Sequence, residues 1–109
     1  GAVVDGDATT DITAESLSIT AASVGSSTDS LDTDVANLTL SVTGSTYVNE
    51  ANALNVVSAS TGLFSLTGAG ATVLTSVTSS GAVSVTLSAG DLTVGSVSAT
   101  GQSVTLSTV

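Results

Sequence analysis

The carboxy-terminal half of the chain alternates apolar and hydroxyl side chains over short runs. From Val83 to Ser88 every second residue is Val or Leu, and the residues between them are Ser or Thr. This alternation is typical of a strand with one buried face, because successive side chains point to opposite faces. The runs are joined at Gly or at Asn and Asp, which favour turns. The pattern therefore predicts short β-strands connected by tight turns.

The strand-like runs recur with a period of about twenty residues. Three Val residues each precede a small polar run that ends at Gly, in the pairs Val57 and Gly62, Val77 and Gly81, and Val97 and Gly101. A second strand-like run follows each Gly. Earlier in the chain, the phrases ESLSITAA and ANLTLSVTG lie about one period apart. We count roughly five units in a single segment over residues 1–109, with no linker between them.

A repeat of about twenty residues that contains two or three strands predicts an all-β parallel β-helix, or β-solenoid, in which each coil lies under the next. A lone coil cannot bury its inward residues, whereas stacked coils can. Ser and Thr between the inward positions are expected to face solvent and to form hydroxyl ladders. Phe64 is expected to fill a corner of the core, and Tyr47 to pack under a turn. The predicted inward positions are Leu17, Ile19, Leu38, Leu40, Val42, Leu54, Val56, Leu63, Leu66, Val83, Val85, Leu87, Leu92, Val94, Val97, Val104 and Leu106.

The ends of such a stack need particular attention. With strands about 4.8 Å apart, five coils rise only about 24 Å, and both terminal coils leave backbone groups unpaired. The final run, QSVTLSTV, carries no charge and no Pro, and no polar cap follows it. We therefore expect the last coil to be covered, either by the continuation of a longer polypeptide or by the first coil of another subunit.

Charge and composition exclude several classes of function. Nine acidic residues and no Lys, Arg or His give a net charge of −9. Such a chain cannot neutralise nucleic-acid phosphates or bind an anionic membrane surface. It has no Cys for disulfides or thiol chemistry, and no apolar run approaches the ~18 residues of a membrane span. The lack of tryptic sites suits an exposed extracellular protein, although compositional drift in a repeat explains it equally well.

Several phrases in the chain match a known repeat pattern. A small-residue turn at Val24 and Gly25 is followed by an LDT phrase from Leu31, a YVNE phrase from Tyr47 and an LTVGSVSATG phrase from Leu92. Together they resemble the repeats of filamentous-haemagglutinin-type exoproteins and other giant bacterial surface β-helix proteins. The resemblance implies a right-handed parallel β-helix at or beyond the bacterial cell surface, acting as a stalk, adhesin or filament. Those repeats carry no catalytic motif, and any adhesive tip is expected outside these residues.

Eight of the nine acids lie in the first fifty residues, which raises the question of calcium. Ca²⁺ takes roughly six to eight oxygen ligands, so carboxylates at alternate positions can converge on one ion. The two candidate groups lack the closing Glu of an EF-hand, and Asp also favours turns, so a solvated turn is the alternative for each. We assign no metal ligand. The two groups are Asp5, Asp7 and Asp11, and Asp29, Asp32 and Asp34.

Asp32 and Asp34 also raise the possibility of a paired-carboxylate hydrolase, because strand spacing places residues i and i+2 on one face. Such a site needs one buried, protonated acid, and its substrate subsites usually need aromatic or basic side chains. The chain offers one Tyr, one Phe and no base. We therefore predict no enzymatic activity, no catalytic residue and no cofactor.

The remaining polar phrases favour structural roles. Asn49 and Asn52 are expected to stack between coils and bond the backbone of their neighbours, and the glycosylation-like triplet at Asn37 is expected inside a buried strand.

Two rival functions stay open. One is a Ser and Thr face that binds ice or a mineral, suggested by TLS phrases at Thr39, Thr86 and Thr105, although a regular Thr-x-Thr file is missing. The other is a functional amyloid subunit. The sequence favours a structural component of an extracellular bacterial filament, stalk or adhesin whose main partner is itself, with host or surface ligands as further partners. It predicts no nucleic-acid partner and no membrane insertion.

Overall fold

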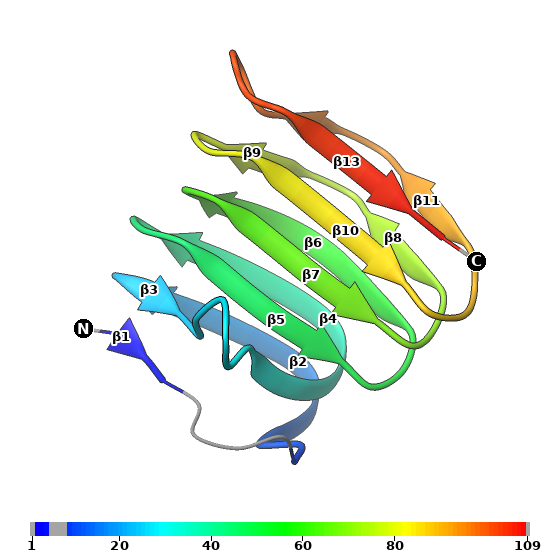
Figure 1. Cartoon of the computed structure of the whole chain (residues 1–109). Coiled ribbons are helices and arrows are strands. Elements are labelled where there is room, and N and C mark those ends of the chain that lie inside the picture. The colour runs from blue at the N-terminus through cyan, green and yellow to red at the C-terminus, as the bar shows by residue number, and fades with distance from the viewer. Residues whose placement is uncertain (1, 5–8, 109) are drawn as a thin grey trace.

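The computed structural model describes residues 2–4 and 9–108, and within these ranges the chain forms strands and no helix. The chain winds in successive turns that stack along one axis, with the N-terminal turns at one end and β13 at the other (Figure 1). The strands are β1 (Ala2–Val3), β2 (Ile12–Ala21), β3 (Ser23–Val24), β4 (Leu31–Val42), β5 (Thr46–Glu50), β6 (Leu54–Thr61), β7 (Phe64–Gly68), β8 (Thr72–Leu74), β9 (Val77–Ser79), β10 (Val83–Leu87), β11 (Leu92–Val94), β12 (Val97–Ser98) and β13 (Val104–Ser107).

Every strand pairs in parallel with a strand of a neighbouring coil. Phe64 of β7 is the Cα partner of Val83 in β10, and Val83 is the partner of Val104 in β13. Successive strands of this kind lie about 19 residues apart, and the chain makes about five turns. The predicted all-β, parallel β-solenoid of roughly five coils is confirmed.

The solenoid has two long walls that enclose the core. One wall contains β2, most of β4 and β6, followed by β8 with β9 and then β11 with β12. The other contains β1, β3, β5, β7, β10 and β13, together with the first residues of β4, which pair with β5. In the later coils of the first wall, one long strand is replaced by two short ones. The bend between β11 and β12 requires Gly95, because a Cβ there would lie 2.9 Å from the carbonyl oxygen of Thr75.

Apolar side chains of both walls meet in the interior, as the alternation predicted. Phe64 is fully buried, which confirms its place in the core. Leu17, Leu92 and Val97 are partly buried against this core. The predicted inward residues that are buried are Ile19, Leu38, Leu40, Val42, Leu54, Val56, Leu66, Val83, Val85 and Leu87.

Four predicted inward positions are not buried, but only the assignment of Leu63 is wrong. Leu63 is only half-buried, because its neighbour Phe64 takes the inward position at the start of β7. Three others have register partners that are buried, but they belong to the last coil, over which no described residue lies. These are Val94, Val104 and Leu106, which are 44%, 45% and 40% exposed.

The repeat alignment through Val57 is also wrong. Leu38 pairs with Val56, but Thr39 pairs with Ser58, so Val57 is an extra residue in a β-bulge. It is 40% exposed. The register partner of Val77 is Ala59, two residues further along the chain. A bulge shifts the side-chain alternation without any change in composition, so spacing between Val residues could not reveal it.

Two turn glycines offer a test of how closely the coils approach. Gly90 and Gly101 both have positive φ, at 82° and 74°. A Cβ on Gly90 would lie 2.3 Å from the backbone nitrogen of Ala71, whereas a Cβ on Gly101 would meet nothing within 4 Å. We expect Gly101→Ala to lower the free energy of unfolding by about 1 kcal/mol, from backbone strain alone. Gly90→Ala adds a clash and should cost about 2 kcal/mol or more. Equal losses in urea denaturation would contradict this account.

Candidate functional site

A ladder of polar side chains joins three successive coils on the outside of the solenoid. The Asn49 side-chain amide donates a hydrogen bond to Asp32 Oδ1 at 3.0 Å, and its carbonyl oxygen accepts one from the Thr67 hydroxyl at 3.0 Å. These three residues are register partners. Asn49 therefore links its coil to both neighbours, but its hydrogen bonds run to side chains, whereas bonds to the backbone of neighbouring coils had been predicted.

The Asn ladder continues at nearby positions. The Asn52 amide donates to Asp34 Oδ1 at 2.9 Å, and the Thr75 hydroxyl donates to Asn55 Oδ1 at 2.7 Å. Asp32 and Asp34 thus each accept a hydrogen bond from an Asn amide. That arrangement gives both carboxylates a structural role in holding coils together, whereas the hydrolase hypothesis asked them to face a substrate.

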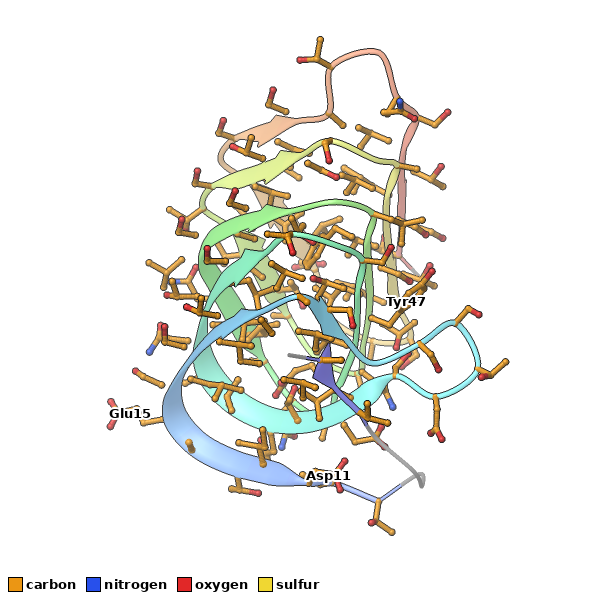
Figure 2. All side chains as sticks on the ribbon, turned by 90° about the vertical axis from the view of Figure 1, so that its left-hand side faces the viewer. Asp11, Glu15 and Tyr47 are labelled. Atoms are coloured by element: carbon orange, nitrogen blue, oxygen red, sulfur yellow. The ribbon has the colours of Figure 1, made fainter. Side chains whose placement is uncertain are left out.

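The candidate calcium ligands are not brought together where the structure describes them. Asp29 lies in a turn in which its backbone N–H and C=O both bond Ser26, as the turn interpretation predicted. Over residues 2–4 and 9–108, no group of three or more acidic side chains is placed to hold a metal ion. Asp5 and Asp7 lie outside the described residues. Asp11 is exposed on the first coil, as is Glu15 (Figure 2).

Glu50 is a buried acid that sequence reasoning missed. It is 1% exposed and occupies an inward position at the end of β5, in register with Thr33 and Gly68. Its Oε2 accepts a hydrogen bond from the Thr33 hydroxyl at 2.5 Å, and its Oε1 accepts one from the Val35 N–H at 2.9 Å. The alternation of side chains along β5 indicates that Glu50 points inward, because Thr46 and Val48 point inward and Glu50 follows two residues later.

Burial raises the pKa of the Glu50 carboxyl. The hydrogen bonds from Thr33 and Val35 act in the opposite direction, and the nearby Asp34 carboxylate adds to the rise. The chain has no Lys, Arg or His, so no side chain can form an ion pair with Glu50. A buried carboxylate without a cation is costly, and the proton is therefore held more tightly than in water.

The wall that contains β7, β10 and β13 carries an ordered array of hydroxyl groups. Ser65, Ser84 and Thr105 are register partners, and so are Thr67, Thr86 and Ser107. We call these six residues the hydroxyl lattice. Of the TLS residues, Thr86 and Thr105 belong to this lattice but lie in different rows, because Thr105 pairs with Ser84. Thr39 lies on the opposite wall in β4.

A shallow hollow of about 550 Å³ lies where the chain turns from the first wall to the second. Its rim includes Ser60 and Thr78, which are register partners, and Gly62 contributes no side chain there. Its lining contains no acidic and no aromatic side chain. The chemistry that it offers is therefore limited to hydroxyl groups and backbone.

The last coil forms an open end of the stack. Among the described residues, β13 pairs with β10 alone, β11 with β8 alone and β12 with β9 alone. We call residues 92–107 the open end. Its edge therefore presents unpaired backbone groups next to the uncovered apolar side chains of Val94, Val104 and Leu106.

The other singled-out residues lie within strands. Asn37 is half-buried in β4, so the glycosylation-like triplet is part of a paired strand. Tyr47 is half-buried in β5 between buried Thr46 and Val48, and it is the register partner of Ser65 in the hydroxyl lattice. Within the described ranges, no helix has the length and apolarity needed to span a membrane.

Comparison of the chain with protein-family models, with curated proteins and with solved structures gave no match. The chain is a β-solenoid repeat protein on the strength of its structure.

The polar ladder can be tested by a pair of matched substitutions. Asn49 makes two side-chain hydrogen bonds across three coils, whereas Asn55 makes one. We expect Asn49→Ala to lower the free energy of unfolding by about 1 to 2 kcal/mol, since mostly buried Asp32 also loses a donor. Asn55→Ala should cost less than about 1 kcal/mol. Urea denaturation of both variants makes the comparison, and a larger loss for Asn55→Ala would be inconsistent with this ladder.

Proposed function

We propose that this chain is a structural, non-enzymatic segment of an extracellular bacterial filament, stalk or adhesin in which coils stack end to end. The observation that supports this best is the open end. Val104 and Leu106 stand in register with buried Val83 and Val85, and they lack only a coil above them. A further coil in the same register would complete the burial.

The energetics favour such an addition. Fully burying one Val or Leu side chain contributes roughly 1.5 to 3 kcal/mol, and three such side chains are uncovered here. The parallel ladder would also give partners to the backbone groups of β13. Residues 92–107 contain no charged side chain, so the edge has no electrostatic barrier against a new strand.

The resemblance to filamentous-haemagglutinin-type repeats supports the same proposal and adds the extracellular location. A shaft made of such coils has backbone hydrogen bonds along its axis and hydroxyl groups on its surface. The first property gives stiffness, and the second keeps the shaft hydrated. Neither property requires a catalytic group or a bound cofactor.

Substitution of two residues on opposite faces of β13 tests whether coils of different copies stack end to end. Leu106 is an inward position, whereas Thr105 faces outward in the hydroxyl lattice. We expect the unmodified chain to elongate with concentration into rods of uniform width, seen by electron microscopy and sedimentation. Leu106→Glu should stop elongation, because it would bury a charge without a partner. Thr105→Glu makes the same change of charge and should leave elongation intact.

A tandem fusion of two copies distinguishes a stalk segment from a polymerising subunit. If the chain is a stalk segment, single copies should stay monomeric. The fused copies should nevertheless melt at a higher temperature, because the second copy covers the open end of the first. Monomeric single copies together with a fusion that melts no higher would overturn the proposal.

A second candidate function is binding to the ordered surface of ice, and the hydroxyl lattice favours it. Adjacent strands lie about 4.8 Å apart, and each strand rises about 3.3 Å per residue, so the hydroxyl groups of the lattice are regularly spaced in two directions. The lattice has no charged member. The lattice spans the three coils of β7, β10 and β13.

We expect thermal hysteresis in a freezing assay if this second function is correct. Thr86→Tyr should abolish the hysteresis, because a large side chain in the lattice prevents flat contact. Thr78→Tyr should retain it, because Thr78 is also exposed but lies in β9 on the other wall. No hysteresis in the unmodified chain would exclude the ice-binding function.

A further inference from the structure

Glu50 stands at a joint between three coils. Its carboxyl group accepts hydrogen bonds from Thr33 and Val35, both in β4 of the preceding coil. Its backbone carbonyl accepts a hydrogen bond from the N–H of Ala69, which follows β7 in the next coil, at 3.1 Å. The adjacent Ala51 N–H donates to the carbonyl oxygen of Thr33 at 2.9 Å. One residue therefore links its own coil to both neighbours.

The core makes room for this polar group. Gly68 follows Glu50 in register, and Leu87 follows Gly68. A Cβ on Gly68 would lie 2.9 Å from a methyl carbon of Leu87, so the Leu87 side chain occupies the space that a larger residue at position 68 would need. Glu50 is thus enclosed between the Thr33 hydroxyl on one side and Gly68 with Leu87 on the other, and only 1% of it is exposed.

Every charged group that faces this joint is acidic. The Asp34 carboxylate on β4 lies close enough to raise the pKa of Glu50. The Asp32 carboxylate bonds Asn49, whose side chain points to the opposite face of β5 from Glu50. The residues in register on the other side, Gly68 and Leu87, do not titrate. No basic side chain is therefore available to stabilise the ionised form of this buried carboxyl group.

We propose that Glu50 acts as a pH-sensitive clasp, which holds its coil against the coil of β4 when the carboxyl is protonated and loosens that contact when the carboxyl ionises. The clasp is independent of end-to-end stacking, because all of its groups lie within one chain.

The direction of the effect follows from the carboxyl pKa, which is raised in the folded protein. Below the ordinary carboxyl range, Glu50 is neutral in both the folded and the unfolded chain. As the pH rises through the ordinary value, the unfolded chain releases the proton first, while the folded chain still holds it. Stability of this joint is therefore highest in acid and is lost as the pH rises through the raised value.

Amide hydrogen exchange measures the clasp directly, at the amides of Val35, Ala51 and Ala69. After correction for intrinsic exchange, we expect their protection to fall about tenfold for each unit by which the Glu50 pKa is raised, as the pH goes from acidic to mildly alkaline. The amide of Phe64, which bonds Ala82 away from the joint, serves as an internal reference. Its protection should change less.

Two glutamine variants separate Glu50 from the general effect of negative charge. Glu50→Gln keeps the shape and removes the ionisation, while its amide nitrogen replaces one of the two accepting oxygens. Protection at the three amides should therefore become independent of pH, even if its level at low pH changes. Glu15→Gln removes one exposed carboxylate from the first coil and should behave like the unmodified chain. An unchanged pH dependence in Glu50→Gln would overturn the clasp.

A carbon-13 titration of the unmodified chain keeps the proposal testable even if Glu50→Gln fails to fold. The Glu50 side-chain carboxyl signal should titrate above the ordinary pKa of a glutamate side chain. A midpoint at or below that ordinary value would overturn the clasp.

Discussion

The whole structure depends on parallel strands that stay in register from coil to coil. Phe64, Val83 and Val104 occupy the same position in three turns, and only this alignment places apolar side chains above one another. A slip of one residue would turn each inward side chain outward. The core is therefore not a property of any single coil. It exists only between neighbours, and the exposed Val and Leu of the last coil show what one coil lacks by itself.

Much of the architecture could be predicted because alternation and period are local properties of the sequence. The strands, the parallel solenoid, the approximate number of coils and most core positions follow from where Val, Leu and Ser recur. The errors occurred where geometry depends on a partner strand. The bulge at Val57 shifts the register by one residue, and its presence becomes visible only when Leu38 and Thr39 are seen to pair with residues that are not consecutive.

The polar residues were harder to place, and the reason is physical. Acidic residues usually lie on the surface, so residue type alone does not place Glu50 in the core, whereas the alternation of β5 assigns it to the interior. Asp32 and Asp34 suggested metal binding or catalysis because spacing alone cannot show which groups donate to them. The Asn amides that do so come from the following coil, some 17 or 18 residues away. Cross-coil partners of this kind are set by register.

The contact between each coil and its immediate neighbours has a mechanical consequence. Most strand pairs join segments about one turn apart, so few interactions hold distant parts of the solenoid together directly. Force applied to the last residues would therefore break the ladder of one coil before it reached the next. Such a shaft would lengthen under load in discrete steps, each releasing about one turn of chain, and would dissipate work gradually instead of failing at once.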